Sequence, residues 1–242
     1  MFSTTYLKTI HNQLSAILNH AVNMYGLKDN VARKAGTMGK EENKEIEFWT
    51  QDEFQAFLEC VADKPISYYA FEMLYWTGIR EGELLALTPA DFNFEKKTFR
   101  INKSYQRLEG KDVITDPKTP KSNRTIVMPD FLAVEMEDFI SSLYGIRDDD
   151  RIFTISKSYL HNEMDRGAKL AGVKRIRIHG LRHSHSSLLI NLGFSVLAIG
   201  ERVGHEAVDI TYHYAHLFPT VQTDMAAQLE TEREALVNVR KE

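Results

Sequence analysis

Residues 98–128 carry a hydrophobic pattern that differs from that of the surrounding sequence. Three short segments there, 98–105, 112–116 and 123–128, alternate β-branched and polar residues and are separated by turn residues. This is the pattern of half-buried strands in a small antiparallel sheet. Long segments on both sides instead repeat their apolar residues at helical spacing. The sequence therefore predicts a mainly α fold with one small antiparallel β-sheet, an α+β class.

The helices expected around this sheet begin and end at recognisable signals. Residues 4–25 place apolar side chains on one face, and Gly26 supplies a stop. Residues 50–53 form a capping-box pattern, which opens another helix. Further helices are expected at 66–76, 80–87, 130–143, 157–170, 179–192, 196–203, 208–214 and about 219–240, with a short strand within 147–155.

A polar, charged and glycine-containing stretch at residues 36–48 divides the chain. Such a composition is typical of a linker, so we expect a small unit over residues 1–45 and a larger domain over residues 46–242. The 242 residues are enough for this arrangement. The first helix has one apolar stripe, and only a short second segment, residues 30–35, follows it. We therefore expect the small unit to be incomplete by itself.

Charge is distributed unevenly, although the formal net charge is only −4. Residues 165–182 hold six Lys and Arg against one Asp, whereas residues 130–150 hold seven acids against one Arg. A chain polarised in this way can present a basic surface to a phosphate backbone while its far side stays acidic. The alternative is that both runs are solvated helix faces.

Composition argues against several classes of protein. The sequence has no run of 18 apolar residues, so no membrane span is expected. The N-terminus lacks the basic and apolar regions of a secretion signal. The single cysteine, Cys60, excludes an intramolecular disulfide framework and a multi-cysteine zinc site. We expect a cytoplasmic protein.

Three dense polar blocks stand out in the larger domain. They are Thr77-Gly78-Ile79-Arg80-Glu81-Gly82-Glu83, then His179-Gly180-Leu181-Arg182-His183, then Gly204-His205 with Tyr214 nine residues after His205. Cleavage of a phosphodiester without a metal needs a nucleophile, positive donors for the phosphoryl oxygens and an acid for the leaving oxygen. Arg80 and Arg182 suit the second task, because a guanidinium can bind two phosphate oxygens and is always charged. The alternative for either arginine alone is a salt bridge.

The histidines of the second block also allow a metal site. His179 and His183 are four residues apart and share a helix face, as in some zinc sites. No H-E-x-x-H arrangement is present and the chain has one cysteine, so we expect no metal. His185 is expected to pack or to face solvent. Tyr214 is one of ten tyrosines, and only its context marks it out.

Taken together, the blocks resemble the tyrosine recombinase (phage integrase) family. The family pattern is T-G-x-R-x-x-E, then H-x-x-R-H, then G-H, then a tyrosine nine residues later, and each part is present here. A further lysine of the family lies in a turn of the small sheet, where this chain has residues 117–126. We choose Lys118, with Lys121 as the alternative. The resemblance covers about residues 46–242 and implies the catalytic core that tyrosine recombinases share with type IB topoisomerases.

The resemblance implies a role for each residue of this core. The implied catalytic residues are Tyr214 as the nucleophile, Arg80 and Arg182 as a clamp on the non-bridging oxygens, His205 as a further donor, Lys118 as general acid and His179 as base. Glu83 and His183 would orient these groups. The chain would form a 3′-phosphotyrosyl link and a free 5′-hydroxyl. Religation would then need no ATP, metal or cofactor.

Partners follow from the same resemblance. Residues 1–45 look like the second half of the helical, SAM-like core-binding domain of phage and conjugative-element integrases. A chain that begins there implies a truncated protein or a remnant, with fewer DNA contacts. Expected partners are double-stranded DNA at attachment sites, other copies in a tetramer held by the helix at about 219–240, and accessory DNA-bending and excision proteins, all at the nucleoid. The expected DNA contacts are Lys8, Lys121, Arg124, Lys174, Arg175 and Arg177.

The function implied is site-specific recombination for integration or excision of a mobile element. One alternative is relaxation of supercoils, as by a type IB topoisomerase. Another is a remnant that binds DNA without catalysis. A zinc enzyme is the weakest alternative.

Overall fold

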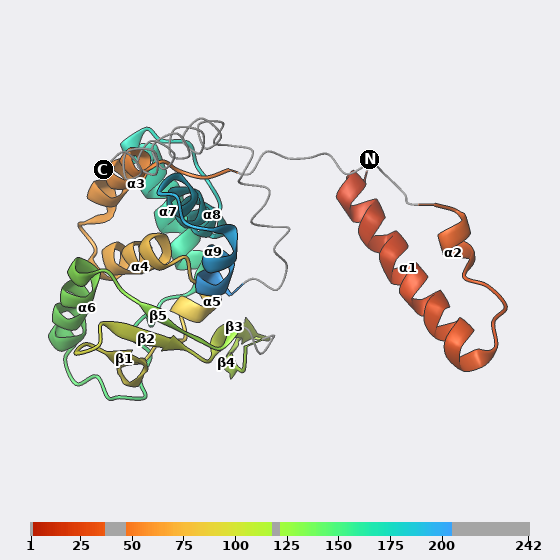
Figure 1. The fold of residues 1–242 in the computed structure, drawn as a ribbon, viewed down its shortest axis with the longest axis horizontal. Coiled ribbons are helices and arrows are strands. Elements are labelled where there is room, and N and C mark those ends of the chain that lie inside the picture. Colours follow the sequence, from red (N-terminus) through yellow and green to blue (C-terminus); the bar gives the residue numbers. More distant parts are fainter. Residues whose placement is uncertain (1, 37–46, 118–121, 205–242) are drawn as a thin grey trace, which may run out of the picture. The chain divides into compact units, whose positions relative to one another are not determined.

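The computed structural model describes residues 2–36, 47–117 and 122–204. The chain forms two compact units, Met1–Glu45 and Ile46–Glu242 (Figure 1). None of the helices within the described ranges has the length and apolar character that crossing a membrane requires. The helices expected at 208–214 and 219–240 lie outside the described residues, as do Lys118, Lys121, His205 and Tyr214.

The first unit contains two helices among its described residues, α1 (Thr4–Tyr25) and α2 (Val31–Lys34). Gly26 ends α1 in the left-handed region, with φ of 69°. The Asn30 side-chain amide donates a 2.9 Å hydrogen bond to Asn19 Oδ1, which ties the start of α2 to α1. The boundaries of α1 predicted from the sequence are confirmed.

The described part of the larger unit is mostly helical. Its helices are α3 (Gln51–Val61), α4 (Pro65–Thr77), α5 (Glu81–Leu84), α6 (Asp130–Ser142), α7 (Lys157–Ala171), α8 (Ile178–Asn191) and α9 (Val196–Val203), with a 3₁₀ turn at Pro89–Asp91. The predicted capping box is present, since Thr50 and Glu53 each accept the other's backbone N–H. The mainly α fold class is confirmed.

The predicted small antiparallel β structure is present, but the described strands divide it between two sheets instead of one. β1 (Phe92–Asn93), β2 (Thr98–Ile101) and β5 (Arg124–Val127) pair antiparallel in the order β1-β2-β5, and β3 (Ser104–Leu108) pairs antiparallel with β4 (Lys111–Thr115). The segment read as one strand breaks at Lys103. The Lys103 ammonium instead bonds Thr88 Oγ1 at 3.0 Å and Asp91 Oδ1 at 2.9 Å. In Figure 1 both sheets lie below α3, α4, α7, α8 and α9.

The short strand expected within 147–155 is also absent from the structure. Single hydrogen bonds to neighbouring main-chain carbonyls hold this segment, instead of the repeated hydrogen bonds of a paired strand. The Ile152 N–H donates to the Leu87 carbonyl at 2.9 Å, and Arg151 Nη1 donates to the Leu85 carbonyl at 3.1 Å. Side-chain pattern alone does not reveal whether an extended segment finds a neighbouring strand.

Two sets of contacts fix α7 and α8 against the rest of the larger unit. Trp49, which is buried, donates through its backbone N–H to Ser184 Oγ of α8 at 2.9 Å and through its indole to the Lys174 carbonyl at 2.6 Å. Gly180 leaves room for this approach, because a Cβ there would lie 3.1 Å from the Glu47 carbonyl oxygen. The second block of the sequence is therefore anchored to the beginning of the domain.

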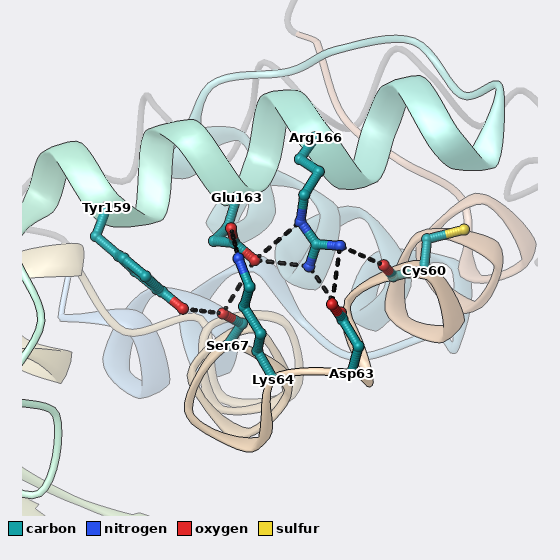
Figure 2. Close-up of polar contacts among 7 residues, drawn as sticks. All are labelled: Cys60, Asp63, Lys64, Ser67, Tyr159, Glu163 and Arg166. Atoms are coloured by element: carbon teal, nitrogen blue, oxygen red, sulfur yellow. Dashed lines mark hydrogen bonds and ion pairs between the residues drawn. The ribbon is translucent and has the colours of Figure 1, made fainter.

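The second set is a polar clamp between the α3–α4 turn and α7 (Figure 2). Glu163 of α7 accepts from Lys64 at 2.6 Å and from Arg166 at 2.7 Å. Arg166 also pairs with Asp63 at 2.8 Å, and Ser67 Oγ lies 2.9 Å from the Tyr159 hydroxyl. Although burial opposes it, these hydrogen bonds and charges hold the pKa of Glu163 below its ordinary value. The cluster pairs its own charges and lies outside the three motif blocks.

Candidate active site

Arg80 lies between α4 and α5, where the chain turns sharply. Gly78 ends α4 with φ of 66°, and a Cβ there would lie 2.6 Å from Cδ2 of His185. Only glycine satisfies both the backbone angle and this contact. The Arg80 backbone N–H donates to Glu83 Oε2 at 2.9 Å, and its Nη1 donates to Glu83 Oε1 at 2.7 Å. Glu83 therefore fixes both the backbone and the guanidinium of Arg80.

Arg182 connects the second block to the first. Its side chain projects from α8 and the residue is 2% exposed. Its Nη1 donates a 2.7 Å hydrogen bond to the Gly78 carbonyl. Burial, together with the positive charges of Arg80 and Arg124, lowers the pKa of Arg182 to about 9, while Glu83 opposes this. Arg182 thus stays cationic at neutral pH, close enough to Arg80 to be repelled by it.

Gly204 brings the start of the third block to the same place. Its carbonyl accepts a 2.9 Å hydrogen bond from Nη2 of Arg80. Gly204 caps α9 with φ of 69°, and His205 is the next residue in the chain. The described ends of all three blocks therefore meet around Arg80, although they are far apart in the sequence.

Arg124 of β5 lies at the same junction, and its side chain is only 8% exposed. Its Nη2 donates to Glu83 Oε2 at 2.9 Å, and its Nε donates to the Arg202 carbonyl at 2.9 Å. We expected Arg124 to contact DNA, but the structure turns its guanidinium into the fold. A single arginine in a strand gives no sequence signal for such an inward position.

His179 and His183 stack edge to face on α8, with ring centroids 4.8 Å apart. Although His179 keeps an exposed surface, desolvation by the surrounding protein, with the charges of Arg182 and Arg80, lowers the pKa of its imidazole. Burial, with His179 and Arg182, lowers the pKa of His183 to about 4. Both imidazoles are neutral at pH 7, so His179 can accept a proton there. Among the described residues no group of three His, Cys, Asp or Glu is placed to hold a metal ion; the expectation of no metal stays a prediction.

His185 and Arg202 form a contact that the sequence analysis missed. Buried His185 accepts a 3.1 Å hydrogen bond at Nε2 from Nε of Arg202. Arg202 also donates to the carbonyls of Val127 at 3.1 Å and Trp76 at 3.4 Å. Burial, with the charge of Arg202, lowers the pKa of His185 to about 3, which keeps the ring a neutral acceptor. The one available signal was a basic residue in the last turn of α9.

The remaining expected DNA contacts lie apart from this junction. Lys174 pairs with Glu47 at 3.0 Å, and Arg175 pairs with Asp165 at 2.6 Å. Both side chains remain well exposed, and exposed Arg177 precedes α8. Lys8 lies on α1 in the first unit. The basic run is therefore partly neutralised by neighbouring acids, and its DNA contacts stay predictions.

Comparisons with known proteins agree with this arrangement. A model described as the phage integrase family matches residues 47–220. The chain is 31% identical over 247 residues to the ICEBs1 integrase of Bacillus subtilis strain 168, covering 94% of this chain and 66% of that protein. It is 26% identical to a protein named tyrosine recombinase XerC-like, from Caldanaerobacter subterraneus subsp. tengcongensis, with the same coverage of both chains. This chain thus spans just under two-thirds of these relatives.

A similar fold occurs in a solved structure of the Tn1549 transposon integrase in complex with transposon right end DNA. The TM-score is 0.76 at 22% identity, with 97% of this chain and 80% of that chain covered. The likeness at this identity concerns the fold. The match over most of the larger unit, which includes all three blocks, supplies the family: the chain belongs to the phage integrase family.

Proposed function

We propose that this chain is part of a site-specific DNA recombinase that integrates or excises a mobile element. The supporting observation is the cluster of Arg80, Arg124 and Arg182 around one carboxylate, Glu83. Three guanidinium groups against one carboxylate leave an excess of positive charge in a largely buried place. Such a site is suited to an anion with several oxygens, as the scissile phosphate is.

The chemistry proposed is a transesterification. The Tyr214 oxygen attacks phosphorus, the bond from phosphorus to the 5′ oxygen breaks, and a 3′-phosphotyrosyl link forms. Neutral His179 takes the tyrosine proton, and Lys118 gives a proton to the 5′ oxygen. Arg80 and Arg182, with His205, stabilise the charge on the non-bridging oxygens. Attack by the 5′-hydroxyl of another strand reverses the step and rejoins the DNA without ATP.

The proposal includes the partners. The substrate is double-stranded DNA at attachment sites, and the solved Tn1549 integrase with its transposon end supports this choice of polymer. The active form is a tetramer on DNA joined through the segment at about 219–240, assisted by DNA-bending and excision proteins. Exposed Lys174, Arg175 and Arg177, with Lys8 and Lys121, contact phosphates. The protein then works at the nucleoid.

Covalent capture tests this function. Nicked duplexes tiled across the DNA that flanks the coding sequence are incubated with the protein, and denaturant-resistant adducts are counted. We expect an adduct with the wild type and with Tyr212→Phe, and none with Tyr214→Phe. An adduct that persists in Tyr214→Phe contradicts the nucleophile. Relaxation of any plasmid without recombinant products would instead support the topoisomerase-like alternative.

The role of Lys118 has its own test. Lys118→Ala should slow cleavage of ordinary DNA by roughly 10²–10⁴-fold, the usual contribution of a general acid. DNA with a 5′-thio leaving group should be cleaved by the variant at nearly the wild-type rate, because a good leaving group needs no proton. Lys121→Ala is the matched control. Rescue of Lys121→Ala instead of Lys118→Ala would transfer the role to Lys121.

A further inference from the structure

Arg124 bonds two distant segments of the site and also the chain just before it. Its Nη1 and Nη2 donate to the two carboxylate oxygens of Glu83 at 3.2 and 2.9 Å. Its Nε donates to the Arg202 carbonyl in the last turn of α9 at 2.9 Å. Its Nη1 also donates to the Ser122 carbonyl at 3.0 Å, and Ser122 directly follows residues 118–121.

The contact with Glu83 ties Arg124 to Arg80. The Glu83 carboxylate accepts two hydrogen bonds from Arg80 and two from Arg124, and the Glu83 side chain is only 5% exposed. Burial alone would raise the pKa of Glu83, but the hydrogen bonds and charge of Arg124, and then those of Arg80, hold it below the ordinary value. Loss of Arg124 would therefore leave a buried carboxylate with half its donors, and the orientation of Arg80 depends on that carboxylate.

The contact with α9 ties Arg124 to the third block. A Cβ on Gly204 would lie 3.0 Å from Nη1 and 3.2 Å from Cζ of Arg124. Arg80 bonds the Gly204 carbonyl in the same turn. Two cations organised by Glu83 thus hold the carbonyl end of α9, where the helix dipole favours positive charge. The chain continues from there to His205.

The donors of Arg124 are nearly all used within the fold. A guanidinium has five N–H groups. The described bonds engage one on Nε, two on Nη1 and one on Nη2, which makes four. Direct binding of a phosphate would require breaking several of them, so Arg124 is poorly placed to bind the substrate itself.

We propose that Arg124 is a positioning residue that joins Glu83 and Arg80, Ser122, and the end of α9 into one phosphate site. The inference rests on the proposed recombinase function. A planar fork that bonds Glu83, the Arg202 carbonyl and the Ser122 carbonyl together cannot be replaced by the single ammonium of lysine. Arg124→Lys should therefore fail even though it keeps the charge.

The test compares Arg124→Lys and Arg124→Gln with a matched control, Arg147→Lys. Arg147 forms a similar fork with Asp150, but it is 83% exposed and lies outside the three blocks. Adduct formation on nicked duplex is measured at saturating protein, and duplex affinity is measured in parallel at several salt concentrations. Displacement of reacting groups by about 1 Å can cost ~10²-fold in rate. In both Arg124 variants we expect the rate of adduct formation to fall by about that factor, while the affinity for duplex DNA stays within about threefold of the wild type. The control should form the adduct at the wild-type rate.

A direct phosphate contact predicts different results. Lysine would then largely restore the rate, and Arg124→Gln would make the negative slope of log affinity against log salt shallower by about 0.9. Either result overturns the proposal, as does a wild-type rate in both variants. An unchanged salt slope with slow adduct formation supports it.

A second readout does not depend on catalysis. Hydrogen exchange of Arg124→Lys should speed up at the end of α9 and at residues 122–124, while the clamp between Lys64, Glu163 and Arg166 keeps its protection (Figure 2). If the wild type forms no adduct, the recombinase function fails, and this exchange pattern still decides whether Arg124 joins these segments. Unchanged exchange at both places contradicts the proposal. Exchange that rises throughout the chain also contradicts it.

Discussion

At the scale of single residues, glycines decide whether the three blocks can meet. Gly204 adopts φ of 69° and leaves room for the guanidinium of Arg124. Gly78 leaves room for the ring of His185 at the start of the first block. These positions carry no reactive group, yet Arg182 bonds the carbonyl of one and Arg80 bonds the carbonyl of the other. The positions of Arg80 and Arg182 therefore depend on the main-chain carbonyls of Gly204 and Gly78, which only glycine can present in this way.

Replacement of Gly204 tests this dependence. Gly204→Ala should lose roughly 1–3 kcal/mol from the left-handed backbone alone. Because its Cβ also crowds Arg124, we expect slower adduct formation on nicked DNA, by at least about tenfold. The matched control is Gly172→Ala at the end of α7, where φ is 68° and no atom lies within 4 Å of the new Cβ. Equal rates for the two variants would contradict the proposed crowding.

At the scale of elements, α4 and α6 bring a buried acid, Glu72, near a half-buried one, Glu135, away from the arginine cluster. Glu72 of α4 is 4% exposed, and its Oε2 has no hydrogen-bond partner among the described residues. Burial, and then the charge of Glu135 on α6, raises the pKa of Glu72 to about 8, against a hydrogen bond from Trp76. Folded Glu72 thus keeps its proton at neutral pH. An unfolded chain would release it above about pH 4.3.

This pKa predicts a dependence of stability on pH. Because the folded state binds the proton more tightly, the contribution of Glu72 is fully present below pH 4 and is lost as pH rises through about 8. Glu72→Gln mimics the protonated carboxyl, so its Tm should fall less than the wild-type Tm between pH 6 and 9. We expect the difference to reach at least about 2–4 °C, which corresponds to ~1 kcal/mol in a domain of this size.

Glu137→Gln provides the control for this measurement, because Glu137 is an exposed acid on α6, the helix that carries Glu135. Its Tm should follow the wild type at every pH. If Glu72→Gln and Glu137→Gln show the same pH dependence as the wild type, the protonated state assigned to Glu72 is wrong.

The elements also show what the sequence could reveal. Helix positions followed from apolar spacing and from local signals such as Gly26 and the capping box at Thr50. Strand pairing did not follow, because Lys103 leaves the ladder to bond Thr88 and Asp91, a choice that depends on distant residues. Local patterns report local structure, and sheet register is a long-range property.

The candidate site shows the same difference between what local sequence patterns reveal and what only the fold reveals. The motif blocks identified Arg80, Arg182 and Glu83, and the structure brings these three together. The inward position of Arg124 had no sequence signal, and that of Arg202 had only its place in the last turn of α9, since an arginine that bonds main-chain carbonyls looks like any other basic residue. These contacts can be identified only from the three-dimensional structure, in which the end of a helix lies beside the guanidinium.

At the scale of the whole molecule, the larger unit brings distant segments to one junction. The turn after α4, strand β5, helix α8 and the end of α9 are joined there by arginines bonded to main-chain carbonyls. The charge excess this creates is the central feature of the proposed function. An anion bound between Arg80 and Arg182 would relieve their mutual repulsion.

The most direct measurement is the chemical identity of the covalent adduct. The wild-type protein is trapped on nicked duplex and digested, and mass spectrometry locates the peptide that carries the nucleotide. The proposed chemistry predicts Tyr214 joined to a 3′-phosphate, with a 5′-hydroxyl on the released strand. A nucleotide on Tyr212 or on any other residue, or a link to a 5′-phosphate, would contradict it.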